Sequence, residues 1–114
     1  MVTIYHNPRC SKSRATMKIL EEKGIQPEII EYLETPPDAA TLDDFLGKLG
    51  MEPRDLMRRS EAPYNELNLK DSAKSRDELL AAMVENPVLI ERPIVVNGEK
   101  IALGRPPENV LDIL

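Results

Sequence analysis

Apolar and polar residues alternate from Val2 to His6, a short segment of β-branched and aromatic residues that predicts a strand ended by Asn7-Pro8. Apolar residues then recur three or four positions apart, which predicts a helix from about Ser11 to Lys23, with Gly24 suited to end it. The apolar face of this helix is expected to contain Ala15, Met17, Ile19 and Leu20. Residues Glu28 to Tyr32 have the composition of a second strand, so this third of the chain predicts two parallel strands with a right-handed crossover.

The middle of the chain is predicted to be helical. Thr41 is a suitable N-cap for a first helix, which Gly50 closes. The apolar residues at helical spacing in this helix are Leu42, Phe45, Leu46 and Leu49. A short helix is expected to begin at Pro53, because proline is favoured in a first turn. Ser75-x-x-Glu78 has the form of a capping box before a third helix, which Asn86-Pro87 ends.

The last part of the chain predicts a hairpin followed by a helix. Two short apolar runs, Ile94–Val96 and Lys100–Leu103, flank Asn97-Gly98-Glu99, and Asn-Gly is a strong hairpin signal. Pro106-Pro107 is expected to start the final helix. The complete order predicts an α/β fold of the thioredoxin-like type, βαβ–(helical insertion)–ββα, with a four-stranded mixed sheet.

Length and composition indicate a single globular domain spanning residues 1–114. Hydrophobic residues make up 41% of the chain and charged residues 31%, a balance that does not favour disorder. The N-terminus lacks the pattern of a signal peptide, and no apolar run reaches the length of a membrane span. One cysteine cannot form an internal disulfide, so we expect a cytoplasmic protein in a reducing compartment.

The distribution of charge argues for a small anion as the partner rather than nucleic acid. The net charge of −5 is opposite to what a phosphate backbone requires. Basic residues nevertheless surround the cysteine and recur later in the chain, at Arg9, Lys12, Arg14, Arg58, Arg59, Arg92 and Arg105. One cysteine and one histidine do not make a zinc site, so no metal is expected.

Cys10 falls between the first strand and the first helix, a position that favours a reactive thiolate. The N–H groups of a first turn are unsatisfied, and the helix dipole places partial positive charge there. Positive charge from Arg14 and hydrogen bonds from His6 and Ser13 would act in the same direction, lowering the pKa of the thiol. The alternative is that Cys10 is a small buried hydrophobic residue, which is common for free cysteine.

The segment Cys10-Ser11-Lys12-Ser13 has the C-x-x-S form of a monothiol active site. Because there is no second cysteine, an external thiol such as glutathione must resolve any oxidised intermediate. A tyrosine-phosphatase loop would require an arginine six positions after the cysteine, where this chain has Thr16.

The segment from His6 to Arg14 resembles the characteristic loop of the arsenate reductase family, thioredoxin-like enzymes coupled to glutathione and glutaredoxin. Further segments resemble that family in the same order and extend the resemblance over nearly the whole chain. They are Tyr32-Leu33-Glu34-Thr35-Pro36-Pro37, Leu56-Met57-Arg58-Arg59 with Pro63-Tyr64, Glu91-Arg92-Pro93-Ile94-Val95-Val96 and Gly104-Arg105-Pro106.

The resemblance implies a thiol-dependent reduction of arsenate to arsenite. Cys10 would form a covalent adduct with the arsenic, and glutathione and glutaredoxin would resolve that adduct. His6 and Ser13 would help to keep Cys10 ionised. No bound cofactor is implied, since glutathione acts as a co-substrate, and neither nucleic acid nor a membrane is an expected partner.

The resemblance also assigns three arginines and one proline to the site. Arg58, Arg92 and Arg105 would bind the oxyanion, a role for which the planar fork of arginine is suited. Pro93 would be the cis-proline that faces the active site in thioredoxin-like folds. Spacing alone leaves open whether Arg58 or Arg59 faces the site, and the register of the motif favours Arg58.

Two other functions remain open from the sequence. A monothiol glutathione-dependent oxidoreductase would also suit the C-x-x-S form, and it would have little need of Arg58 or Arg105. A non-catalytic regulatory module, like the relatives of this fold that bind RNA polymerase, would have a thiol of ordinary pKa.

Overall fold

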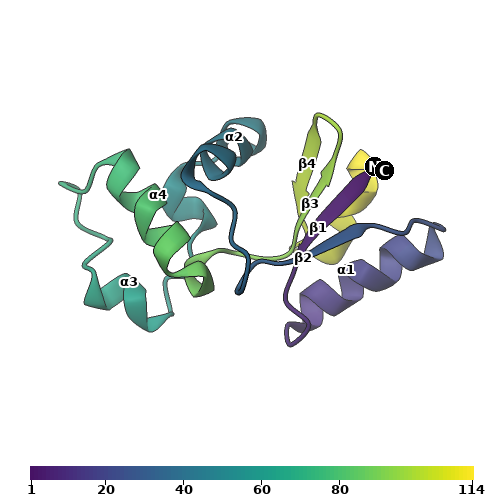
Figure 1. Cartoon of the computed structure of the whole chain (residues 1–114), viewed down its shortest axis with the longest axis horizontal. Helices are drawn as coiled ribbons and strands as arrows, with labels where there is room; N and C mark the ends of the chain where they lie inside the picture. The colour runs from purple at the N-terminus through teal and green to yellow at the C-terminus, as the bar shows by residue number, and fades with distance from the viewer. The chain divides into compact units, whose positions relative to one another are not determined.

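The computed structural model describes residues 1–114 and divides them into two compact units. The first unit joins Met1–Thr35 to Arg92–Leu114, and the second is the intervening segment Pro36–Glu91 (Figure 1). The predicted helical insertion is therefore a compact unit of its own. The prediction of one domain spanning the whole chain stays a prediction. None of the helices combines the length and the apolar character that a membrane crossing requires.

The first unit is built on the predicted four-stranded mixed sheet, whose strands are β1 (Val2–His6), β2 (Glu28–Glu31), β3 (Ile94–Asn97) and β4 (Lys100–Leu103). Their order across the sheet is β2-β1-β3-β4. Strand β1 pairs in parallel with β2 and antiparallel with β3, and β3 pairs antiparallel with β4. The thioredoxin-like sheet is thus confirmed, with the predicted hairpin turning at Gly98, whose φ of 62° suits glycine.

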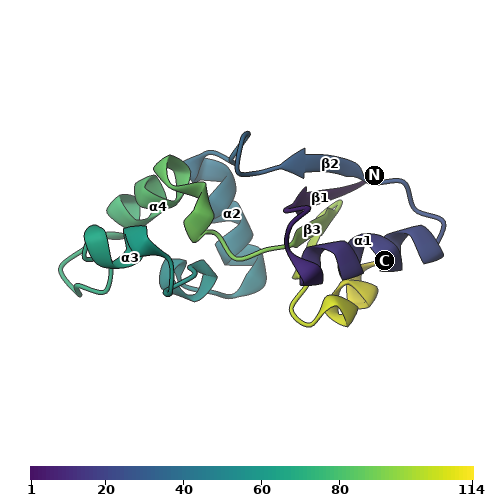
Figure 2. The same cartoon turned by 90° about the horizontal axis from the view of Figure 1, so that it is seen from below.

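One face of the sheet is covered by α1 (Ser11–Glu22) and by the 3-10 helix η3 (Pro107–Ile113), as Figure 2 shows. The core between them is apolar and consists of Val2, Ile4, Leu20, Val95, Ala102, Val110 and Ile113. Burying such a side chain contributes about 1.5–3 kcal/mol, so this small cluster is the main source of stability for the unit. Through Ile4 and Leu20 it holds β1 and α1 together.

Three details of the predicted elements are wrong. The final helix is a 3-10 helix that begins at Pro107, in place of a regular α-helix. In α1 the predicted apolar residue Ala15 is exposed, and the buried positions are Ser13, Thr16 and Leu20. These small polar side chains can be buried because their hydroxyls are hydrogen-bonded: Ser13 Oγ contacts His6 of β1, and the Thr16 hydroxyl donates to the Lys12 carbonyl one turn earlier in α1.

The third error concerns the start of α2 (Ala39–Leu49). Its N-cap is Asp38, whose carboxylate accepts the Thr41 N–H at 2.8 Å. Thr41 is therefore not the N-cap. Its own N–H is one of the unsatisfied donors of the first turn, and the carboxylate of Asp38, three positions earlier, accepts it. Gly50 closes the helix in the left-handed conformation, as predicted.

The second unit consists of short helices around its own core. After α2 come η1 (Pro53–Leu56), α3 (Ala62–Glu66), α4 (Arg76–Glu85) and η2 (Pro87–Leu89). The capping box of Ser75 and Glu78 is formed as predicted, whereas α3 was not predicted. The fully buried side chains include Leu42, Leu46, Leu56, Met83, Leu89 and Ile90.

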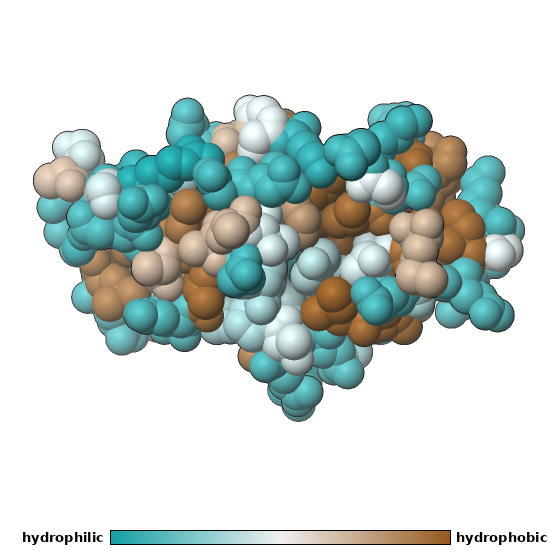
Figure 3. Space-filling view, turned by 45° about the horizontal axis from the view of Figure 1, so that its top comes forward, coloured by the Kyte–Doolittle hydropathy of each residue, from teal (hydrophilic) through white to brown (hydrophobic).

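The surface is mixed in character. The face drawn in Figure 3 has several apolar patches separated by hydrophilic residues. The large apolar side chains that stay exposed are Met1, Ile29, Leu33, Leu67, Leu111 and Leu114. Apolar residues scattered in this way are ordinary on a protein surface and do not by themselves mark an interface.

Candidate active site

Cys10 is the N-cap residue of α1 and lies at the end of the loop that follows β1. Asn7 shapes this loop: its carbonyl accepts the Cys10 N–H at 3.0 Å, and its Oδ1 accepts the Arg9 N–H at 3.0 Å. The Cys10 side chain makes no capping hydrogen bond to the first turn of α1. The sulfur therefore stands next to the positive end of the helix and is mostly buried.

The electrostatic surroundings favour the ionised form of Cys10. Burial acts against ionisation and raises the pKa of the thiol, but the backbone N–H groups of Ser13 and Lys12 and the guanidinium groups of Arg92 and Arg105 act the other way. Their sum lowers the pKa of Cys10 below its ordinary value. The predicted thiolate is thus favoured by backbone N–H groups in the first turn of α1 and by two arginines that come much later in the sequence.

The sheet topology explains why Arg92 and Arg105 act on the same sulfur. Arg92 precedes β3 and Arg105 follows β4, and these strands are antiparallel neighbours. Tyr5 of β1 pairs with Ile94 of β3, so the start of β3 lies beside the end of β1 that leads to Cys10. Both arginines consequently lie at the end of the sheet at which β1 leads into the cysteine loop.

Two hydrogen bonds fasten these arginine segments to each other. Arg105 Nη1 donates to the carbonyl of Arg92 at 3.3 Å, and Gly104 N donates to the carbonyl of Pro93 at 2.9 Å. The Arg92–Pro93 peptide bond is cis, as the resemblance implies, and the Arg105–Pro106 bond is cis as well. Gly104 has no room for a side chain, because a Cβ there would lie 2.7 Å from Thr16 Oγ1.

The partly buried His6 and the buried Ser13 form a pair next to the loop. His6 Nδ1 lies 2.6 Å from Ser13 Oγ, and the same oxygen accepts the Asn7 N–H at 3.0 Å. Ser13 is completely buried, and its backbone N–H is one of the groups that lower the pKa of Cys10. This pair therefore connects the end of β1 with the first turn of α1 and holds that turn in place.

Arg14 acts mainly on the loop rather than on the sulfur. Its Nη1 donates to the Pro8 carbonyl at 3.0 Å, and its charge lowers the pKa of His6. Arg14 contacts Cys10 through its backbone N–H, which donates to the Cys10 carbonyl at 3.0 Å, and its side chain is not among the groups that lower the pKa of Cys10. Its predicted role in stabilising the thiolate stays a prediction.

Arg58 and Arg59 belong to the second unit. Arg58 pairs with Glu61 at 3.0 Å and with Glu91 at 3.6 Å, and it is largely buried. Arg59 is more exposed and lies 3.8 Å from Asp55. The two carboxylates that hold Arg58 give it a fixed position in this unit, and its role toward an oxyanion stays a prediction.

Sequence reasoning missed two features of the site. Glu31 pairs in register with His6 across the two parallel strands, and only the strand register reveals that. Asn7 organises the loop through both its carbonyl and its side chain, and the Asn-Pro pair gave a local signal for a turn. No group of three or more His, Cys, Asp or Glu side chains is arranged to hold a metal ion.

Comparisons with known proteins match nearly the whole chain. A family model described as the ArsC family matches residues 5–113. The uncharacterized protein YfgD of Escherichia coli is 60% identical over 114 residues, covering 99% of this chain and 96% of its own. An arsenate reductase of Haemophilus influenzae is 50% identical, covering 99% and 98% respectively. The solved structure of an arsenate reductase from Vibrio cholerae has a TM-score of 0.95 at 55% identity, covering 99% of this chain and 97% of its own.

Proposed function

This chain belongs to the ArsC family, and on that premise we propose that it reduces arsenate to arsenite with Cys10 as the nucleophile. The observation that carries the proposal is the surroundings of Cys10, where Arg92, Arg105 and the first turn of α1 lower the pKa of the thiol. A thiolate next to two guanidinium groups suits attack on a small oxyanion, because the cations that ionise the sulfur also attract the substrate.

The first step would be displacement at arsenic. The Cys10 thiolate donates its electron pair to arsenic, a sulfur–arsenic bond forms, and one oxygen leaves as hydroxide and takes a proton to become water. Arg92 and Arg105 would neutralise the charge that builds on the remaining oxygens. Arg58 would add a third guanidinium in the proposal, as the family resemblance implies.

The electrons would come from glutathione. Cys10 is the only cysteine in the chain, so the protein cannot form a disulfide of its own to supply two electrons. Two glutathione molecules, with glutaredoxin assisting at the adduct, would be oxidised to one glutathione disulfide as arsenic goes from the pentavalent to the trivalent state. The overall balance is one hydrogen arsenate, two glutathione and two protons giving arsenous acid, glutathione disulfide and water. We place this reaction in the cytoplasm, where these thiols are kept reduced.

The test is an arsenate-dependent assay in which NADPH and glutathione reductase report the glutathione disulfide formed. We expect turnover with wild-type protein, glutathione and glutaredoxin together, and loss of turnover when either thiol component is omitted. Arsenite is quantified in parallel and should equal the disulfide formed.

One result would replace the proposal with its closest alternative. If the protein turns over glutathionylated substrates but forms no arsenite from arsenate, it is a monothiol glutathione-dependent oxidoreductase. The C-x-x-S form around Cys10 is compatible with that activity. Arg92 and Arg105 lie near Cys10 and suit an oxyanion substrate, so they favour arsenate reduction over this alternative.

A further inference from the structure

Gly104 is packed between two segments that carry groups acting on Cys10. It is buried, follows β4 directly and precedes Arg105. A Cβ built on it would lie 2.7 Å from Thr16 Oγ1 and 2.8 Å from Pro93 Cγ. Real Cβ atoms do not approach other heavy atoms so closely. The backbone at this position therefore fits between α1 and the residue that precedes β3 only because it has no side chain.

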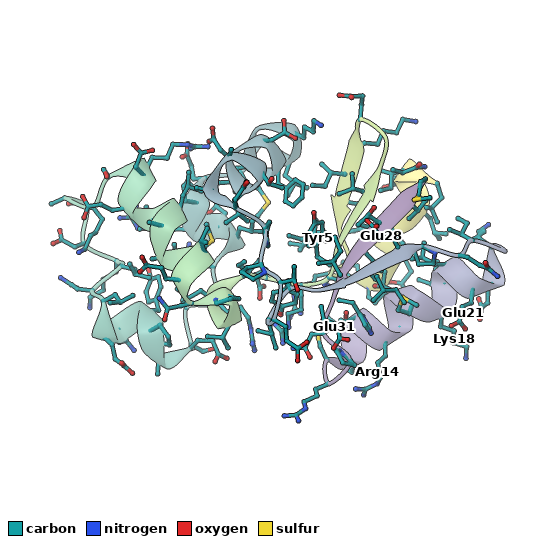
Figure 4. The ribbon with its side chains drawn as sticks, in the orientation of Figure 1. Tyr5, Arg14, Lys18, Glu21, Glu28 and Glu31 are labelled. Carbon is teal, nitrogen blue, oxygen red and sulfur yellow. The ribbon has the colours of Figure 1, made fainter.

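Thr16 is the contact on α1, the helix that has Cys10 as its N-cap. It is completely buried, and its hydroxyl donates to the Lys12 carbonyl at 2.8 Å. Figure 4 shows Arg14 and Lys18 on the side of α1 that points away from the sheet, and Thr16, two positions from each, lies on the inner side. Turning the hydroxyl away would break its hydrogen bond in a buried position, so Oγ1 is a fixed neighbour.

Pro93 is the contact on the other side, and it follows Arg92 directly in the chain. Its ring is bonded to its own backbone, so Cγ cannot rotate away from Gly104. The Gly104 N–H donates to the Pro93 carbonyl at 2.9 Å. Arg105 Nη1 donates to the Arg92 carbonyl at 3.3 Å. The two arginines that lower the pKa of Cys10 are thus each held within one residue of this contact.

We propose that Gly104 is a positioning residue for the site of Cys10. The absence of a side chain there lets the segments of Arg92 and Arg105 pack closely against α1, so that both guanidinium groups reach the sulfur at the start of that helix. The proposal rests on the role of Cys10 in the proposed function. Gly104 acts through the position of the two arginines, since its own N–H is engaged by the Pro93 carbonyl. A side chain here would move both charges away from the sulfur and remove neither.

The other glycines of the chain do not perform this task. No heavy atom within 4 Å would oppose a Cβ on Gly24, Gly47, Gly50 or Gly98. Gly47 is also exposed in α2 and has no positive φ, so alanine fits there without strain. It is the matched control for a glycine-to-alanine exchange at Gly104.

The test compares Gly104→Ala with Gly47→Ala. The pH dependence of Cys10 alkylation by iodoacetamide, in the substrate-free protein, gives the pKa of the thiol. For Gly104→Ala we expect that pKa to rise and alkylation near neutral pH to slow about threefold, because Arg92 and Arg105 stand farther from the sulfur. In the arsenate assay the same variant should lose about 10- to 100-fold in kcat/KM, the effect of a small misplacement. Gly47→Ala should change neither quantity.

A second pair of variants decides the question if Gly104→Ala is too unstable to study. Thr16→Ala removes the Oγ1 contact, and alanine favours a helix, so this variant is expected to fold. In Thr16→Ala/Gly104→Ala the Pro93 ring alone opposes the new Cβ. The Cys10 pKa of this double variant should lie above that of Thr16→Ala, because the arginine segments are still displaced.

Two results would overturn the proposal. The first is a Cys10 pKa that is unchanged or lowered in Gly104→Ala while the Tm falls, which would give Gly104 a purely structural role. The second is an equal Cys10 pKa in Thr16→Ala and in the double variant. Because the titrations contain no arsenate, either failure is separate from a failure of the protein to reduce arsenate.

Discussion

Replacing Cys10 by serine is expected to abolish arsenate reduction, with a loss in kcat on the order of 10⁴-fold or more. A serine hydroxyl stays protonated at neutral pH, and the donors that lower the pKa of Cys10 are too weak to ionise it. The chain has no other thiol that could take over the attack. The arsenate-dependent assay with glutathione and glutaredoxin measures the loss.

The same variant is expected to fold normally, which makes the loss interpretable. Cys10 is an N-cap whose side chain makes no capping bond, and serine is among the preferred N-cap residues. We expect a Tm equal to or slightly above that of the wild type. If Cys10→Ser keeps a tenth or more of the activity, the nucleophile is not this sulfur and the proposed chemistry is wrong.

The second large effect is expected at Arg92, whose guanidinium outweighs that of Arg105 among the charges that lower the pKa of Cys10. Arg92→Ala should reduce kcat/KM for arsenate by about 10²–10³-fold, the range for losing one donor to a developing oxyanion. It should also raise the Cys10 pKa. Arg92→Lys should restore much of the thiol pKa but little of the arsenate activity, because lysine keeps the charge and loses the bidentate fork.

Two comparisons decide what Arg92 does. Arg59→Ala removes an exposed arginine that pairs with Asp55 in the second unit, and it should leave kcat/KM within about twofold. Exchange of Cys10 with glutathione disulfide uses the thiolate but no oxyanion. If Arg92→Ala slows that exchange as strongly as it slows arsenate reduction, Arg92 acts on the sulfur alone and oxyanion binding by this residue is excluded.

The position of Cys10 could be predicted from the sequence because its determinants are local. A short β-branched segment, the Asn7-Pro8 turn and a helical repeat follow one another within about twenty residues. The hairpin at Gly98 and the capping box of Ser75 were predictable for the same reason. In each case a special backbone conformation or an orphan donor demands a particular residue type.

Features that depend on tertiary pairing were not predictable in this way. The cap of α2 is Asp38 rather than Thr41, because both types can cap and only the path of the chain decides between them. Ala15 is exposed and Ser13 is buried, because the hydrogen bond to His6 outweighs the apolar character of alanine at that turn. Glu31 gave no signal at all, since its relation to His6 exists only through the parallel register of β1 and β2.

The central claim is that Cys10, Arg92 and Arg105 together bind an oxyanion, and a crystal of the wild-type protein soaked in arsenate tests it most directly. The predicted result is an arsenic atom bonded to Cys10 Sγ or in contact with it, with the guanidinium groups of Arg92 and Arg105 donating to its oxygens. The same density would show whether Arg58 also reaches the anion. Arsenate bound only at other surface sites, with the Cys10 sulfur unmodified and unoccupied, would contradict the account.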